Sequence, residues 1–313
     1  MAVSNGPSIV VFSTLFPNTA QPHAGLFIRE RMFRVGESLP LTVVSPVPWF
    51  PFQSLLRLWR PHFRPAVPRC EVQRGVEVLH PRFLSVPGVL KKLDGLFLAI
   101  ASFRTMWRLR REGRLDIIDA HFGYPDGYAA TLLGRWVDCP VTITLRGTET
   151  RHADTPSLKP RLVRALRSAD RIFAVSESLK NIALQLGIAP EAVRVIGNGV
   201  DTQRFRPVDR SKARAALGIA AEVPVLISVG GLTERKGFHR VIELLPALRK
   251  RFPSLVYLIV GGASAEGNWQ AQLKKMVTDL DLEDTVRFLG VVDPDDLKVP
   301  LSAADVFVLA TRN

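Results

Sequence analysis

Short apolar runs alternate along the first two thirds of the chain with segments whose apolar residues recur every three or four positions. The short runs are typical of buried strands, and they fall at 8–13, 40–45, 76–80, 116–120, 141–145, 171–175 and 193–196. Helical spacing predicts helices near 25–38, 94–113, 126–136, 158–168 and 176–187. This alternation indicates an α/β fold, a doubly wound parallel sheet with helices on both faces. Ligands of such sheets bind beyond the carboxyl ends of the strands.

The last third repeats the pattern around the stretch VLISVGGLTERKGF, residues 225–238. A buried strand ends at Gly230–Gly231, where the chain must turn. A helix then begins at Phe238, and Pro246 inside it should produce a kink. Further strands are predicted at 255–260, 286–289 and 306–309, with helices near 268–280 and 294–304. A second, smaller nucleotide-type sheet of about four strands is therefore expected.

The chain has 313 residues, which favours about two domains. Its formal net charge is +13, and most of that excess lies in the first 203 residues. We place the domain boundary where this charge density changes, giving a first domain at 1–203 and a second at 204–313. A basic first domain could face an anionic lipid, an acidic substrate or nucleic acid. No DNA- or RNA-binding motif is present, so a nucleic-acid partner is not expected.

Two cysteines, Cys70 and Cys139, predict neither a disulfide framework nor a metal cluster. The start MAVSNGPSIVVFSTLF lacks a basic segment before its apolar run, so it is predicted to be a first strand and not a signal peptide. No apolar run is long enough for a membrane-spanning helix. These features favour a cytoplasmic protein.

Three loops of the first domain contain candidate site residues. Gly25 precedes a helix, where it could let the backbone approach a phosphate or sugar, or could serve only the loop's own dihedral angles. His121 follows the strand at 116–120 and Asp126 follows it closely. A histidine there can bind a hydroxyl or phosphate or move a proton, or it can be structural. Arg146 and Glu149 follow the strand at 141–145, as polyol- or phosphate-binding groups or as a surface ion pair.

The turn of the second domain offers a phosphate site. The start of a helix presents free N–H groups and a positive dipole potential. Gly237 permits close backbone approach there, and Arg235 and Lys236 add two cations. The alternative is a solvated basic turn.

Residues 47–68 interleave aromatic residues with Arg57, Arg60 and Arg64, and the predicted helix at 94–113 ends in a basic run. Surfaces that combine apolar side chains with arginines suit the membrane interface. For the helix, the alternative is a core-packed helix with a solvated basic end.

Several motifs together resemble the retaining glycosyltransferases of the GT-B fold, family four. They are FPNTAQPHAGLFIRERM, SAADRIFAVSESLKN, VRVIGNGVD, SVGGLTERKGF, FLGVVDPDDL and SAADVFVLATRN. The opening motif is similar to a branch that makes bacterial cell-surface polysaccharides. The resemblance implies two Rossmann-like domains facing a cleft and the transfer of a sugar from a nucleotide sugar with retained configuration. The acceptor would be a polysaccharide or a lipid-linked glycan.

The resemblance also implies roles for particular residues. Lys236 and Arg235 would bind the diphosphate of a UDP- or GDP-linked donor, Gly25 would contact its phosphate or sugar, and Gly290 and Val291 would lie near the base. His121 would contact the transferred sugar, while Asp126, Arg146 and Glu149 would lie on the acceptor side. Neither a metal nor a cofactor is expected, and the leaving diphosphate would take the acceptor proton, without a protein nucleophile.

The sequence departs from the family pattern at several points. Gly230–Gly231 stands where Gly-Arg is common, and Arg146–Gly147 where His-Gly is common. The family's two glutamates eight positions apart would follow ATRN, and they are absent from the sequence. We therefore expect the second domain to be incomplete and the 313-residue chain to bind donor weakly and turn over little.

Two other functions fit the same pattern. A nucleotide-sugar epimerase of the same fold would need no acceptor. A non-catalytic remnant would use the basic aromatic segment to bind the inner face of an anionic membrane.

Overall fold

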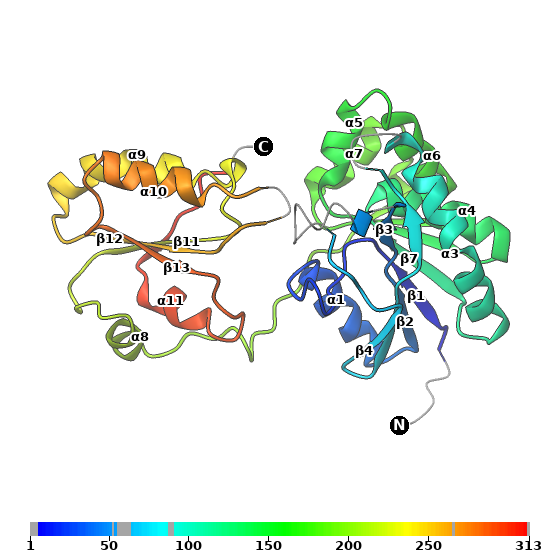
Figure 1. Ribbon diagram of the computed structural model, residues 1–313, viewed down its shortest axis with the longest axis horizontal. Coiled ribbons are helices and arrows are strands. Elements are labelled where there is room, and N and C mark those ends of the chain that lie inside the picture. The colour runs from blue at the N-terminus through cyan, green and yellow to red at the C-terminus, as the bar shows by residue number, and fades with distance from the viewer. Residues whose placement is uncertain (1–5, 52, 55–63, 87–90, 265–266, 312–313) are drawn as a thin grey trace. The chain divides into compact units, whose positions relative to one another are not determined.

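The computed structural model describes residues 6–51, 53–54, 64–86, 91–264 and 267–311. Its internal contacts divide the chain into two units, Met1–Gly199 and Val200–Asn313 (Figure 1). The predicted boundary after residue 203 lies close to this division. Arg57 and Arg60, which we assigned to a membrane-facing segment, lie outside the described residues.

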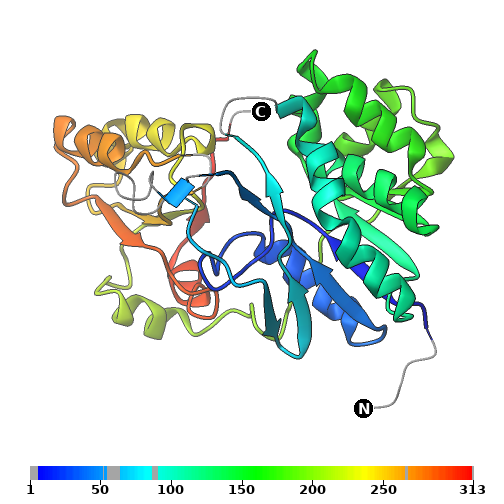
Figure 2. The ribbon, with the colours of Figure 1, turned by 45° about the vertical axis from the view of Figure 1, so that its right-hand side comes forward.

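The first unit contains an eight-stranded sheet with the order β10-β9-β8-β7-β1-β2-β5-β4. All neighbours in it are parallel except the edge strand β4, which is antiparallel to β5. In Figure 2 the blue and cyan strands of this sheet lie side by side. The strands are β1 (Ile9–Phe12), β2 (Leu41–Val44), β4 (Cys70–Gln73), β5 (Val76–Leu79), β7 (Ile117–His121), β8 (Val141–Leu145), β9 (Arg171–Ala174) and β10 (Val193–Val195).

Beyond the carboxyl ends of β2 and β5, the chain continues into a separate two-stranded parallel sheet, β3 (Val47–Trp49) and β6 (Arg82–Leu84). The α-helices described in the first unit are α1 (Leu26–Gly36), α3 (Asp94–Arg111), α4 (Tyr128–Val137), α5 (Thr148–Asp154), α6 (Lys159–Ser168) and α7 (Glu177–Gln185).

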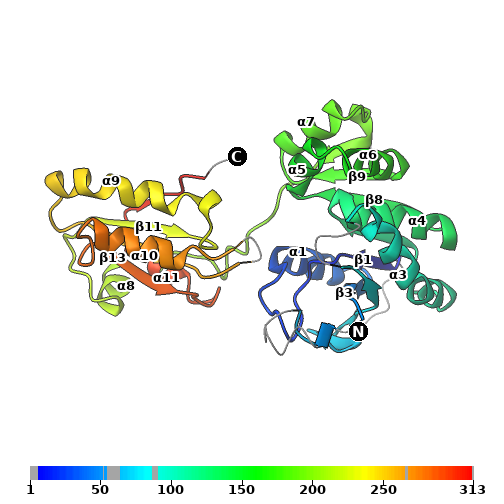
Figure 3. The same cartoon turned by 45° about the horizontal axis from the view of Figure 1, so that its top comes forward.

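Alternate strand residues point into two separate cores, as the two-residue period of a strand requires. Val10 and Phe12 of β1 pack in the core that includes α3, α4 and α6. Val11 packs in the other core, with Ile28 and Met32 of α1. Helices therefore cover both faces of the sheet, with α3 beside α4 (Figures 1 and 3). The predicted α/β fold is confirmed.

The second unit contains a four-stranded parallel sheet with the order β13-β12-β11-β14. Figure 1 shows α9 and α10 along one face and α8 and α11 along the other. The elements are α8 (Arg210–Ala216), β11 (Val225–Val229), α9 (Phe238–Arg251), β12 (Val256–Val260), α10 (Gln270–Asp279), β13 (Val286–Gly290), α11 (Lys298–Ala303) and β14 (Val306–Phe307).

Helix α9 follows the predicted pattern closely. Its buried residues are Phe238, Val241, Ile242 and Leu245, which lie on one face at helical spacing. Pro246 lies inside the helix, and three cations occupy the last turn, where they complement the helix dipole.

One expectation for the second unit was wrong. We took 306–309 for a buried strand, but Val306 and Phe307 are 50% and 53% exposed. The reason is that β14 lies at the edge of the sheet and pairs only with β11.

Within the described ranges, no helix has the length and apolar character that crossing a membrane requires. Cys70 is exposed and Cys139 is buried, and both are free thiols.

Candidate functional site

Four of the predicted residues lie at one edge of the first unit's sheet, at the end of a strand or shortly after it. His121 is the last residue of β7, and Arg146 directly follows β8, which pairs with β7. Asp126 lies in the turn after β7, and Glu149 lies in the first turn of α5 after β8. The parallel topology therefore brings these side chains to the carboxyl ends of adjacent strands.

His121 and Arg146 are in direct contact. Arg146 donates a hydrogen bond from Nε to Nδ1 of His121 over 3.0 Å. Burial, reinforced by the charges of Arg146 and Arg31, holds the pKa of His121 well below its usual value. The imidazole is therefore neutral, and an Nδ1 that accepts a hydrogen bond leaves the proton on Nε2.

The Nε2 atom of His121 is buried and has no hydrogen-bond partner among the described residues. Asp119 Oδ2 lies 3.5 Å away but does not have hydrogen-bonding geometry. Asp119 itself accepts a hydrogen bond from Thr142 over 2.7 Å, and burial raises its pKa to about 6. A buried donor without a partner is costly to a fold and commonly marks a functional position.

The cationic part of this site is larger than the sequence suggested. Arg146 donates from Nη1 to Oδ1 of Asn198 over 3.1 Å, and Arg31 donates to the carbonyl of Ile196 over 3.1 Å. Burial and the nearby Arg31 lower the pKa of Arg146 to about 10, so its guanidinium remains charged at neutral pH. The guanidinium also lies 5.2 Å from the centre of the Phe27 ring.

Sequence reasoning missed Arg31 and included Asn198 only as part of the motif VRVIGNGVD. Arg31 sits on α1, the helix that Gly25 introduces, and Asn198 follows β10. Both residues therefore follow strands of the same parallel sheet. Their position after a predicted strand was the sequence feature that could have identified them as site residues.

Asp126 is buried and contacts Thr14 after β1. Its carboxylate accepts hydrogen bonds from the backbone N–H of Thr14 over 2.9 Å and from the Thr14 hydroxyl over 3.1 Å. Burial raises the pKa of Asp126 to about 7, and the neighbouring Glu149 adds to the rise. This carboxyl therefore joins two strand-end loops and changes charge near neutral pH.

Glu149 is fully buried and organises the surrounding backbone. It accepts hydrogen bonds from the N–H groups of Gly123, Arg146 and Gly147 over 2.9, 3.1 and 2.7 Å. It is not the surface ion pair with Arg146 that was one alternative, because only the backbone of Arg146 reaches its carboxylate. Its direct contact with an acceptor stays a prediction.

Gly25 has a structural reason to be glycine. Its φ angle is 67°, and a Cβ atom there would lie 2.4 Å from the carbonyl oxygen of Leu15. Gly25 thus lets the loop after β1 pack tightly before α1 begins. Its contact with a donor stays a prediction.

In the second unit, glycines close the ends of three adjacent strands. Gly230 follows β11 and donates to Val260 over 2.9 Å, while Gly261 follows β12 and donates to Gly290 over 2.7 Å. A Cβ on Gly261 would lie 1.8 Å from the oxygen of Gly230. The backbones of Gly230, Gly261 and Gly290 therefore pack closely together at the carboxyl edge of the sheet, and we call this surface the glycine floor.

Lys236 and the start of α9 lie over this floor. The aliphatic part of Lys236 passes within 3.7 Å of a Cβ built on Gly230, and its side chain is half-buried. Its ammonium group makes no ion pair or hydrogen bond within the described part of the chain. Gly237 begins α9 with a φ of 72° and no side-chain cap, so N–H groups of the first turn are available to an anion.

The other predicted donor residues surround the same floor. Arg235 is exposed beside Lys236, and Val291 is exposed directly after Gly290 at the end of β13. The buried hydroxyl oxygen of Thr233 has no hydrogen-bond partner among the residues described. Across those same residues, no cluster of side chains has the composition of a metal site.

Family comparisons match both units. The Glycosyltransferase Family 4 profile matches residues 70–204, and the Glycosyl transferases group 1 profile matches residues 209–313. The two ranges together cover most of the chain.

Two curated relatives and one solved structure are similar to this chain. The putative teichuronic acid biosynthesis glycosyltransferase TuaC of Bacillus subtilis is 28% identical over 96% of this chain and 74% of its own length. A D-inositol 3-phosphate glycosyltransferase of Saccharomonospora viridis is 30% identical over 64% of this chain and 50% of its own length, so the chain spans half of that relative.

The fold is shared with Anabaena HepE, solved in complex with UDP and glucose. The TM-score is 0.67 at 21% identity, and the match covers 97% of this chain and 74% of HepE. These comparisons and the two parallel sheets identify the chain as a GT-B glycosyltransferase, with a family 4 domain followed by a group 1 domain.

Proposed function

We propose that this protein transfers a sugar from a UDP- or GDP-linked donor to a polysaccharide or lipid-linked acceptor, with retention of the anomeric configuration. The observation that carries the proposal is Lys236, half-buried at the start of α9 and without an ion-pair partner within the described residues. A cation beside free helical N–H groups suits a diphosphate. HepE, which shares the fold, was solved with UDP and glucose.

In this proposal the second unit stabilises the leaving group. Lys236, Arg235 and the first turn of α9 place positive charge where the diphosphate departs, so no metal ion is required. The bond from the anomeric carbon to the diphosphate breaks, the bond to the acceptor oxygen forms on the same face, and the diphosphate takes the acceptor proton. No protein nucleophile takes part.

The first unit would bind the sugars. The Nε2–H group of His121 is a buried donor, and it suits a hydroxyl oxygen of the transferred sugar. The neutral imidazole can donate this hydrogen bond without placing a charge in the site. Arg146, held by His121 and Asn198, would face the acceptor, with Asp126 supporting the loop after β1. His121 is thus a binding group and not a general base.

The competing reading is a nucleotide-sugar epimerase, and both family matches favour the transferase. The two separate in a product analysis by mass spectrometry and NMR, with a panel of UDP- and GDP-sugars. Free nucleotide diphosphate that forms only when a glycan acceptor is added supports transfer. An epimerised nucleotide sugar formed from donor alone would overturn the proposal.

We also propose that the first unit binds the cytoplasmic face of an anionic membrane through one side of α3. Four large apolar side chains lie exposed there at helical spacing, Leu96, Ile100, Phe103 and Trp107, and Ile100 is 58% exposed. Trp136 of α4 extends the patch, with its ring 5.8 Å from that of Phe103. Exposed apolar stripes of this length are uncommon on proteins without a partner.

Charge favours an anionic bilayer as the occupant of this α3 face. Arg104 and Arg111 are exposed beside the stripe and make no ion pair within the described residues, and the Arg111 guanidinium lies 4.8 Å from the Trp107 ring. The core-packed alternative for this helix is also correct for its other side, where Leu98, Met106 and Leu109 are buried. Tryptophan with flanking arginine is typical of interfacial surfaces.

Vesicle flotation tests the membrane proposal. The double change Ile100→Gln with Trp107→Gln should reduce binding to vesicles that contain phosphatidylglycerol by about tenfold, since apolar insertion is lost. Leu244→Gln, at a 62% exposed position of α9, is the matched control and should bind as the parent does. Equal binding by all three proteins, or binding that ignores both lipid charge and salt, would contradict the proposal.

A further inference from the structure

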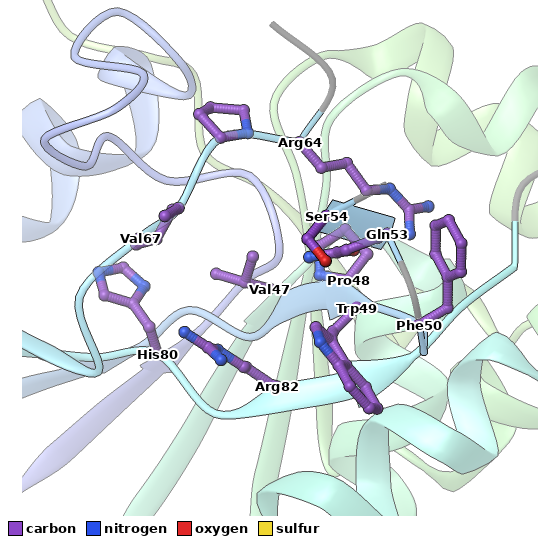
Figure 4. A pocket seen from close by; sticks show the side chains of 12 residues that line it. Val47, Pro48, Trp49, Phe50, Gln53, Ser54, Arg64, Val67, His80 and Arg82 are labelled. Carbon is purple, nitrogen blue, oxygen red and sulfur yellow. The ribbon is translucent and has the colours of Figure 1, made fainter. Parts of the chain in front are cut away.

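A pocket of about 280 Å³ lies in the first unit beside the two-stranded sheet β3–β6. Its described lining includes Trp49, Phe50, Gln53, Arg64, His80 and Arg82. Figure 4 shows Trp49 and Arg82 projecting into it from the two strands, opposite Gln53 and Arg64. Because β3 and β6 extend beyond the carboxyl ends of β2 and β5, the pocket lies at the same edge of the fold as His121 and Arg146.

Strand register places Trp49 and Arg82 on one face. Val47 pairs with Arg82, and Trp49 pairs with Leu84, in parallel register. Paired residues share a face, and residues two apart on a strand share it too, so the Trp49 ring and the Arg82 guanidinium are diagonal neighbours. A flat apolar ring beside a planar cation suits a sugar ring that bears an anionic group.

The charged side chains that line the pocket are cationic. None of the twelve lining residues that the structure describes is acidic, and two of them are arginines. Arg64 is committed to the protein, donating to the carbonyl of Ser85 over 2.6 Å and lying 5.6 Å from the Phe50 ring. Arg82 is exposed and makes no ion pair or hydrogen bond within the described ranges, so its guanidinium is available to a ligand.

The neutral polar groups also point to a polyol. Gln53 has a buried Oε1 atom without a hydrogen-bond partner in the described structure, and it can accept a hydrogen bond from a hydroxyl. His80 is not available, because its Nδ1 lies 2.9 Å from the carbonyl of Ser45 and its Nε2 lies 3.2 Å from Glu71. His80 therefore forms a fixed wall of the pocket.

We infer that this pocket binds an anionic sugar residue of the acceptor, a hexuronate or a sugar phosphate, with the carboxylate or phosphate on Arg82, the ring against Trp49 and a hydroxyl donating to Gln53. That the bound residue belongs to the acceptor rests on the proposed function. The volume of about 280 Å³ is just below the usual range of ligand pockets, about 300 to 1,000 Å³, and so suits one sugar ring.

Binding of small probes to the purified chain tests the inference, by calorimetry or saturation-transfer NMR. Glucuronate and glucose 6-phosphate should bind at least about tenfold more tightly than glucose, and Arg82→Gln should remove that preference. Arg69→Gln, another exposed arginine near the pocket, is the control and should keep it. Trp49→Leu should weaken all three sugars, while leaving inorganic phosphate binding unchanged.

The other outcomes are decisive as well. Inorganic phosphate that binds as tightly as glucose 6-phosphate would overturn the sugar-ring contact, and acid-sugar binding that survives Arg82→Gln would overturn the site. Binding of UDP and of GDP is measured on the same samples. A protein that binds one of these nucleotides but no acid sugar refutes the pocket and leaves the proposed function standing. Acid-sugar binding with neither UDP nor GDP binding keeps the pocket and removes the proposed function.

Discussion

At the scale of single residues, burial sets the protonation of the groups at the edge of the first unit's sheet. His121 and Asp126 are both fully enclosed, and burial is the largest cause of both pKa shifts. The histidine loses its proton more easily, and the carboxyl keeps its proton to higher pH. Their two effects on stability therefore have opposite signs.

For His121 we expect a neutral ring with the proton on Nε2 throughout the range from pH 5 to 8. Its pKa lies well below the usual 6.5, because burial and two arginines disfavour the charged form. Nitrogen-15 NMR of histidine-labelled protein, assigned with His121→Asn, measures this directly. A ring signal that titrates near pH 6.5, or a proton on Nδ1, would contradict the geometry with Arg146.

For Asp126 the pKa of about 7 in the folded protein lies above the usual 3.8. The folded state then holds a proton that the unfolded chain releases between these two values. The contribution to stability is present below pH 3.8 and is lost as the pH rises through about 7. Asp126→Asn keeps an acceptor for the Thr14 N–H but cannot ionise.

The free energy of unfolding of Asp126→Asn, relative to that of the parent, should therefore rise from pH 4 to pH 8 by on the order of a few kcal/mol, because only the parent loses stability over this range. Urea titrations at both pH values measure it. A difference that does not change with pH would show that Asp126 is already ionised in the folded protein at pH 4.

The sequence predicted the residue types at the strand ends but not their contacts. His121, Arg146 and Asp126 could be singled out because each follows a recognisable strand. Their partners Arg31, Thr14 and Asn198 are distant in sequence, and only the packing of the sheet brings them close. The contacts of Glu149 could not be predicted for another reason. Its carboxylate accepts hydrogen bonds from three backbone N–H groups, and a pattern of side chains does not reveal such contacts.

At the scale of elements, the start of α9 depends on a glycine. Gly237 has a φ of 72°, and a Cβ there would lie 1.9 Å from the carbonyl oxygen of Ala310. The turn can therefore approach the chain after β14 only because this residue has no side chain. The same turn carries the proposed diphosphate site.

Gly237→Ala should lower the free energy of unfolding by about 3 kcal/mol or more, because backbone strain and a backbone clash add. Gly218→Ala is the matched control. Gly218 also has a positive φ, 61°, but a Cβ there would meet nothing within 4 Å, so only about 1–2 kcal/mol should be lost. Equal losses in chemical denaturation would show that the contact with Ala310 does not constrain the turn.

Elements with a clear apolar run or a helical repeat were predictable, and short elements without either pattern were not. Strand β8 was located to the residue, and α3, α6 and α9 closely. The elements β3, β4, β6, α5 and α8 were missed, because their three to seven residues form neither a clear apolar run nor a helical repeat of apolar positions. The β3–β6 pair matters most among these, because it forms one side of the pocket.

At the scale of the whole molecule, the positive charge suits the ligands proposed for each unit. The net charge is +13, and a nucleotide diphosphate, an acidic sugar and an anionic bilayer are all negative. Such a charge raises the rate of association with anions and makes it sensitive to salt. Specificity must still come from particular groups, and Lys236 is the group that we propose for the donor.

Calorimetric titration of UDP and GDP into the purified chain tests the central claim most directly. We predict that one of the two nucleotides binds and that Lys236→Ala weakens it by about tenfold or more, as loss of a charged hydrogen bond would. Lys250→Ala, which removes an exposed cation from the other end of α9, should leave the affinity unchanged. Equal affinities for the parent and both variants, or no binding of either nucleotide, would contradict the proposed donor site.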